Sequence, residues 1–200
     1  MSSFHTRLTA VGMALLGAVA LAGPADASIR SAAPASASAT SDRAHADFSA
    51  QARAAGLDDS RAAELQRRID TELATAGGRQ VAANKIDLDG KGVLVLPLPG
   101  EKRARDLNAQ DAAGAFADPC KRGWVCLYPQ PNYEGRMWGL YDCYKVSIGY
   151  TGTGSWYNNQ PSNYHVKFYG HDGNLGWTSP GGPVGDPNAP WDWVGYVKPC

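Results

Sequence analysis

The residues with the most specific chemistry are four cysteines, Cys120, Cys126, Cys143 and Cys200. An even number of cysteines in a small exported module predicts a framework of disulfide bonds. Four cysteines allow three pairings, and the sequence alone does not choose among them. We favour a bond between Cys143 and Cys200, which would tether the end of the chain, beside a short ring closed by Cys120 and Cys126. A zinc site with four thiolates would need two close cysteine pairs, and only one is present.

The histidines and serines form no recognisable catalytic motif. A hydrolase triad could be drawn from Ser155, His165 and Asp172, but no Gly-x-Ser-x-Gly pattern frames the serine. His165 and His171 are therefore expected at the surface or in strand turns, and the His-Glu-x-x-His pattern of zinc proteases is missing. A glycosidase needs two facing carboxylates in a cleft, for which a module of about 80 residues has little room. We expect a protein that is not an enzyme.

The C-terminal part of the chain has the pattern of an all-β module. Residues 119–200 contain all six tryptophans, all nine tyrosines and all four cysteines. Aromatic and β-branched residues between Gly, Pro and Asn predict short strands. They are expected over residues 124–128, 136–140, 155–157, 164–169 and 191–197. Loops are expected over 149–154 and over 179–190, the second with four prolines and three glycines.

Two aromatic residues and a glycine near the start of this module have a specific spacing. Tyr128 is followed by Tyr133 and Gly135, and Ser155 comes later in the chain. This pattern resembles the Greek-key signature of βγ-crystallins, in which an aromatic corner packs over a folded hairpin and a serine ties the hairpin down. A degraded second copy begins at Tyr169. The resemblance implies a βγ-crystallin-like Greek-key sandwich.

Combined with the early cysteine pair and an export signal, the module resembles the secreted actinobacterial peptidase-inhibitor family of βγ-crystallin fold, whose type member inhibits metalloproteinases. The resemblance implies an inhibitor of extracellular metallo- or serine peptidases, and it transfers no inhibitory residue to this chain. A rigid loop that enters a peptidase cleft loses little entropy on binding. The candidates are Lys121, Arg122 and Gly123 inside the small ring, and the loop 180–190. The alternative function is a non-catalytic module that binds cell-wall or other polysaccharide.

The tryptophans could serve that alternative. Trp177, Trp191 and Trp193 lie in segments rich in Gly and Pro, where some of them could be exposed as a recognition surface. Because side chains alternate along a strand, Trp191 and Trp193 would share one face. The other interpretation is that these indoles belong to the core.

No cofactor is expected. Many βγ-crystallins bind calcium through two Asn or Asp residues followed by Ser/Thr-Ser, but the aligned residues 150–155 lack both ligands. The 19 basic and 19 acidic residues balance, without a basic stripe, which argues against nucleic acid as a partner. A monomer that binds a peptidase is expected.

The N-terminus has the pattern of a secretory signal. Arg7 precedes an apolar run over residues 8–22, and a small-x-small pattern predicts cleavage after Ala27. An uncleaved membrane anchor is the alternative, but no basic cluster follows the apolar run. Residues 1–27 are thus assigned to a signal peptide and 28–45 to a disordered leader. The mature protein is expected to be extracellular and free of membrane segments.

Residues 46–118 predict a small α+β segment. A helix is expected from an N-cap at Ser60 to Gly77, with Ala62, Leu65, Ile69 and Leu73 on its apolar face. Strands over 80–88 and 93–98 would form a hairpin. The segment is too small to bury a substantial core alone, so it is either a removable pro-segment or a retained spacer. We favour the pro-segment, because residues 99–105 would be an accessible processing site. Its boundary with the module 119–200 is placed between Gly114 and Pro119.

Overall fold

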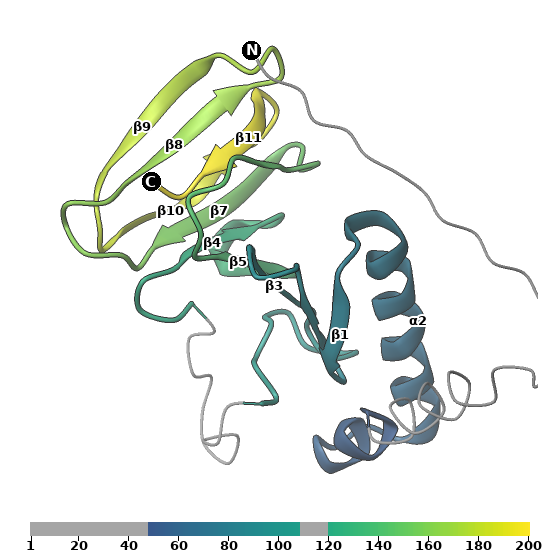
Figure 1. Ribbon diagram of the computed structural model, residues 1–200. Helices are drawn as coiled ribbons and strands as arrows, with labels where there is room; N and C mark the ends of the chain where they lie inside the picture. The colour runs from purple at the N-terminus through teal and green to yellow at the C-terminus, as the bar shows by residue number, and fades with distance from the viewer. Residues whose placement is uncertain (1–47, 109–119) are drawn as a thin grey trace, which may run out of the picture. The chain divides into compact units, whose positions relative to one another are not determined.

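The computed structural model describes residues 48–108 and 120–200. The predicted signal peptide, the leader and the boundary between Gly114 and Pro119 lie outside these residues. Within the described ranges, no helix is long and apolar enough to cross a membrane. The described residues are mostly β-sheet, as predicted for the C-terminal part (Figure 1).

The first stretch begins with helical residues 48–54 and continues into helix α2 (Asp59–Ala76). The cap is Asp58, two residues before the predicted Ser60, and its carboxylate accepts a hydrogen bond of 2.8 Å from the Arg61 N–H. The helix ends at Gly77, as predicted, and buries the predicted apolar residues Ala62, Leu65 and Ile69. The three strands that follow are β1 (Arg79–Ala82), β2 (Lys85–Asp87) and β3 (Gly92–Val95).

The predicted strand 80–88 is in fact two strands, because the chain turns at Asn84. The buried amide of Asn84 donates hydrogen bonds of 2.8 Å to the carbonyls of Leu96 and Arg105. These bonds fix a turn that no Gly or Pro signals in the sequence. β2 therefore pairs with β1 on one side and with β3 on the other.

The second stretch contains a 3-10 turn, η1 (Pro131–Tyr133), and eight strands. The first four strands are β4 (Val125–Tyr128), β5 (Met137–Leu140), β6 (Val146–Ser147) and β7 (Thr153–Asn158). The last four are β8 (His165–Gly170), β9 (Leu175–Gly181), β10 (Val184–Pro190) and β11 (Val194–Lys198).

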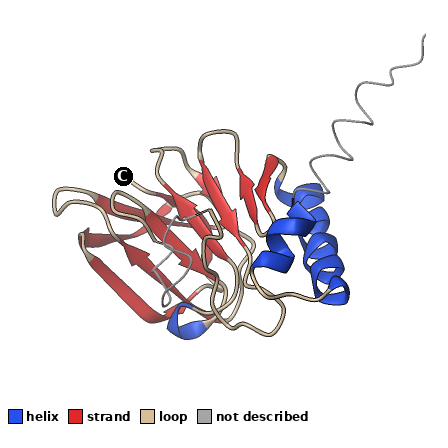
Figure 2. Ribbon diagram, turned by 90° about the horizontal axis from the view of Figure 1, so that it is seen from below, coloured by secondary structure: helices blue, strands red, loops and turns tan. Residues whose placement is uncertain are grey.

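The strands form two antiparallel sheets. The larger one has seven strands in the order β1-β2-β3-β5-β4-β7-β10, and the smaller one has four in the order β6-β11-β8-β9. The two sheets exchange strands: β6 pairs only with β11 of the smaller sheet, and β10 pairs only with β7 of the larger sheet. Figure 2 shows the longer helices (blue) together at one side of the array of strands, and a short helical turn apart from them.

The larger sheet runs through both described stretches because β3 pairs with β5. Four residue pairs form this junction, from Gly92 opposite Leu140 to Val95 opposite Met137. On one face, α2 packs against β2 and β3 through Leu65, Ile69 and Leu94. The smaller sheet covers the same face beside it. Trp138 of β5 lies opposite Leu94 of β3. Its side chain packs against both apolar clusters and links them.

The predicted loop 179–190 is wrong, because most of these residues belong to β9 and β10. Both strands lie at the edge of their sheets, where one row of N–H groups needs no partner, so proline is tolerated. Pro187 lies at an irregularity of the ladder between Asp186 and Ala189. The composition suggested a loop, whereas the edge position permits a strand.

We predict that the two stretches unfold in one transition. Ile69 is fully buried between α2 and the strands, so Ile69→Ala should lower the free energy of unfolding by about 2–5 kcal/mol. The exposed Glu64→Ala is the matched control on the same helix and should change it by less than about 0.5 kcal/mol. Urea unfolding would be followed by far-UV circular dichroism and tryptophan fluorescence, since all tryptophans lie after residue 119. Two separate midpoints, with only the dichroism signal affected by Ile69→Ala, would contradict the prediction.

Candidate functional site

The small ring predicted at the start of the module is present. Cys120 and Cys126 form a disulfide with a Cα–Cα distance of 5.7 Å, and Cys143 pairs with Cys200 at 5.3 Å. Inside the ring, the Trp124 N–H donates to the Lys121 carbonyl at 3.1 Å and closes a tight turn. Gly123 has a φ of +88°, a conformation that L side chains adopt only at a cost. The ring therefore holds a single folded turn.

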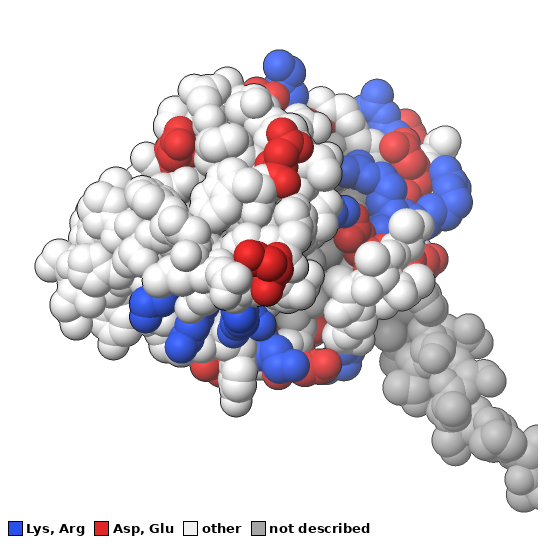
Figure 3. Space-filling view, turned by 90° about the horizontal axis from the view of Figure 1, so that it is seen from above, with Lys and Arg blue, Asp and Glu red and all other residues white. Residues whose placement is uncertain are grey.

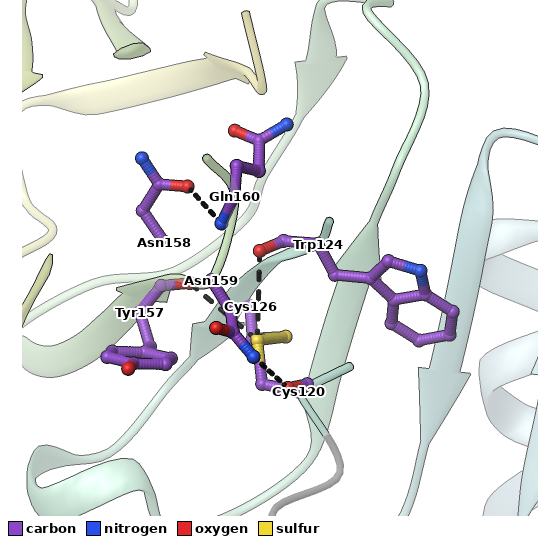
Figure 4. The surroundings of a disulfide bond; sticks show 7 residues. All are labelled: Cys120, Trp124, Cys126, Tyr157, Asn158, Asn159 and Gln160. Atoms are coloured by element: carbon purple, nitrogen blue, oxygen red, sulfur yellow. Dashed lines mark hydrogen bonds between the residues drawn. A yellow bond between two sulfur atoms is a disulfide. The ribbon is translucent and has the colours of Figure 1, made fainter. Parts of the chain in front are cut away.

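Asn159, which directly follows β7, anchors this ring at three points. Its side-chain amide donates to the Cys120 carbonyl at 2.8 Å (Figure 4). Its backbone N–H donates to the Trp124 carbonyl, and its carbonyl accepts from the Gly123 N–H, both at 2.8 Å. Asn159 is not among the site residues predicted from the sequence. The Asn158-Asn159 pair after the aromatic strand was the available signal.

The two basic residues of the ring differ in their surroundings. The Lys121 ammonium lies 3.4 Å from the Asp106 carboxylate and 5.3 Å from the centre of the Trp124 ring. Arg122 is exposed and has no ion pair within the residues that the structure describes. The guanidinium of Arg122 is therefore available to a partner, whereas Lys121 is engaged.

Asp106 is a charged residue that the sequence analysis missed, and it lies beneath Lys121. Its carboxylate is 7% exposed and also contacts the Lys85 ammonium at 2.8 Å. Burial alone would raise the pKa of Asp106, but hydrogen bonds from Lys85 and from the Asn108 N–H, and the charges of both lysines, hold it below its ordinary value. No local sequence pattern indicates this cluster, because its members come from three separate segments.

The residues of the proposed Greek-key signature meet at the folded hairpin that contains η1. The Ser155 hydroxyl accepts from the Tyr133 N–H at 2.8 Å and donates to the Gln130 carbonyl at 2.7 Å. The rings of Tyr128 and Tyr133 meet edge to face with centroids 5.6 Å apart. Gly135 has a φ of +84°. Ser155 thus holds the hairpin through two hydrogen bonds.

The residues that could be drawn as a triad have other partners. The Ser155 hydroxyl makes its two hydrogen bonds to the backbone of the folded hairpin. One ring nitrogen of His165 contacts the Ser179 carbonyl at 3.0 Å, and one of His171 contacts the Asp192 carbonyl at 2.9 Å. In the described ranges, no group of three or more His, Cys, Asp or Glu residues could hold a metal ion.

The three tryptophans singled out in the sequence have different environments. Trp191 is fully buried, and its Nε1–H donates to the Tyr128 carbonyl at 2.9 Å. Trp177 and Trp193 are 43% and 38% exposed. The prediction that Trp191 and Trp193 share a strand face is wrong, because β11 begins only at Val194 and both residues precede it.

We predict that the turn in the ring depends on the glycine conformation. Gly123→Ala should lower the free energy of unfolding by about 1–2 kcal/mol. The added Cβ would have free space around it, so the cost comes from the positive φ, which alanine adopts unfavourably. Gly149→Ala is the matched control, since Gly149 is equally open and has no positive φ. Chemical unfolding measures both variants. Equal effects of the two substitutions would show that the turn is not constrained.

We predict a pH dependence from Asp106. An unfolded aspartate has a pKa of about 3.9. Because the folded-state pKa of Asp106 is lower, its contribution to stability is complete above about pH 5 and is lost as the pH falls through the unfolded-state and then the folded-state pKa. The difference in unfolding free energy between wild type and Asp106→Asn should therefore shrink between about pH 5 and pH 2. A difference that stays constant over this range would contradict the assignment.

Comparison with known proteins adds one finding. Residues 113–178 match the model of peptidase inhibitor family I36, a range that begins before the ring and ends within β9. No curated protein and no solved structure matches the chain.

Proposed function

We propose that this protein is a secreted inhibitor of an extracellular metallo- or serine peptidase, because residues 113–178 match the model of peptidase inhibitor family I36. The family match is the observation that carries the proposal. A peptidase inhibitor family implies a protein that binds peptidases without being an enzyme. The match includes the small ring, β4 to β8 and most of β9, and it leaves out β10 and β11.

We propose that the ring residues Lys121, Arg122 and Gly123 make the inhibitory contact. A disulfide, a closed turn and three hydrogen bonds between the ring and Asn159 fix the ring before any partner arrives. Such pre-organisation reduces the conformational entropy that is lost on binding. The two exposed basic side chains at the tip give the ring a chemical signature that an acidic peptidase surface or subsite would recognise.

The architecture around the ring supports a βγ-crystallin-like Greek-key arrangement. β5, β4 and β7 are neighbours in one sheet, whereas β6, which lies between β5 and β7 in the chain, pairs in the other sheet. β8, β9 and β11 repeat this arrangement, with β10 paired in the first sheet. Each half therefore gives one strand to the other, and the Ser155 hairpin is where the signature predicts it.

Two further parts of the proposal concern maturation. The two disulfides fit an oxidising, extracellular location. In place of the pro-segment favoured from the sequence, we propose that residues 48–108 are a retained spacer, because β3 pairs with β5 and the predicted processing stretch 99–105 is held in place. Within it, the Lys102 carbonyl accepts from the Gly135 N–H at 2.7 Å, and Ala104 is buried. Loss of residues 48–108 from the secreted protein, measured by intact mass, would contradict this.

We predict that Arg122 contributes more to inhibition than Lys121. Arg122→Ala should raise the inhibition constant roughly tenfold or more, as expected for an exposed side chain that becomes buried at the centre of an interface. Lys121→Ala should have a smaller effect, because its ammonium is already paired with Asp106. Inhibition constants would be measured against thermolysin-like and subtilisin-like peptidases.

The matched control is Arg67→Ala, an exposed arginine on α2 far from the ring in the sequence. It should leave the inhibition constant unchanged. If the wild type inhibits a peptidase and neither ring variant changes its constant, the ring is not the contact. If the wild type inhibits no peptidase in either class, the proposed function itself is contradicted.

A further inference from the structure

β9 and β10 are edge strands of different sheets. Residues of both strands line a slot with aromatic walls at this side of the module. Its volume is about 210 Å³. The residues that matter for its chemistry are Trp156, Phe168, Trp177, Asp186, Pro190 and Trp193. No residue of the small ring lines it, so this site lies beyond the proposed inhibitory contact.

The strand registers explain why these side chains face one another. Asp186 lies opposite Trp156 in the β10–β7 pair, and Trp177 lies opposite Phe168 in the β9–β8 pair. Paired residues of antiparallel strands project to the same side of their sheet. Trp156 and Phe168 are buried between the two sheets, so Asp186 and Trp177 also point toward the inner side. The Trp177 ring lies 5.7 Å from Trp156 and 5.4 Å from Phe168, measured between centroids.

Asp186 brings an unpaired negative charge to this aromatic slot. One carboxylate oxygen accepts a hydrogen bond of 2.8 Å from the Asn188 N–H. None of the ion pairs among residues 48–108 and 120–200 involves Asp186. A carboxylate that lies beside aromatic walls and has no ion-pair partner offers a cationic ligand an opposite charge.

We propose that this slot binds the ammonium group of a lysine side chain from a protein partner. Aromatic faces attract cations through their quadrupole, and Trp177 and Trp193 offer partly exposed indoles for this purpose. The Asp186 carboxylate supplies the opposite charge. The volume suits one long side chain and not a folded segment. A lysine has the required shape, with an apolar stem for the walls and a charged end for the carboxylate.

Pairing of a partner's backbone at these edges is disfavoured. Pro180 lies in β9, and Pro187 and Pro190 lie in β10, where they remove N–H donors from the edges. Seen from above, the side of the molecule that carries β8 and β9 has few charged side chains (Figure 3). Recognition at this side of the module therefore depends on side chains.

The test is a titration of the ¹⁵N-labelled protein, followed through the indole N–H signals of Trp177 and Trp193. The probe is N-acetyl-lysine methylamide, and its matched control is N-acetyl-norleucine methylamide, which has the same chain without the ammonium. We expect saturable shifts with the lysine compound and binding of the norleucine compound that is weaker by at least about threefold. Asp186→Asn should weaken lysine binding by about threefold or more and leave norleucine binding unchanged.

Asp172→Asn is the control variant, because the Asp172 carboxylate accepts from the Asn174 N–H in the same way but does not line the slot. It should bind the lysine compound as the wild type does. Equal binding of both compounds, or lysine binding that does not respond to Asp186→Asn, would overturn the proposal. Saturation by N-acetylglucosamine without a response to the lysine compound would also overturn it, in favour of a glycan site.

Discussion

The pairing of β3 with β5 is the contact on which the rest of the structure depends. It turns two pieces that are small on their own into one seven-stranded sheet. α2 and the smaller sheet then cover neighbouring parts of the same face, and Trp138 packs against both. Without β3, β5 would be an exposed edge with unpaired N–H and C=O groups beside a half-uncovered indole. The segment 48–108 therefore acts as part of the core.

The same dependence extends to the candidate site. The ring is closed by its own disulfide, but Lys121 at its tip is held by Asp106, a residue of the first stretch. Asp106 in turn is held by Lys85 of β2. A change in the first stretch can therefore alter the charge that the ring presents, although Arg122 remains available. The ring and the aromatic slot both depend on β7, because Asn159 directly follows this strand and Trp156 lies within it.

Local patterns in the sequence predicted the elements that depend on local physics. The apolar face of α2 and the ring cysteines follow from spacing along the chain, whereas the role of the hairpin serine was implied by the resemblance to βγ-crystallins. Three features did not follow. Asn84 splits a strand through contacts with distant carbonyls, the prolines after Ser179 lie in edge strands, and Asp106 meets two lysines only after folding. Each depends on neighbours that are remote in sequence, and no local propensity encodes these contacts.

The order of the strands along the chain also has a consequence for the nascent protein. α2 and the strands β1 to β3 are synthesised before β5 exists, so β3 is the last strand of a partial sheet whose outer backbone groups have only water as a partner. β5 (Met137–Leu140) is synthesised later and then pairs with the exposed edge of β3. Such a non-local step is slow compared with helix or hairpin closure. During that interval, the unfinished chain is at its most vulnerable to pairing with a neighbouring copy.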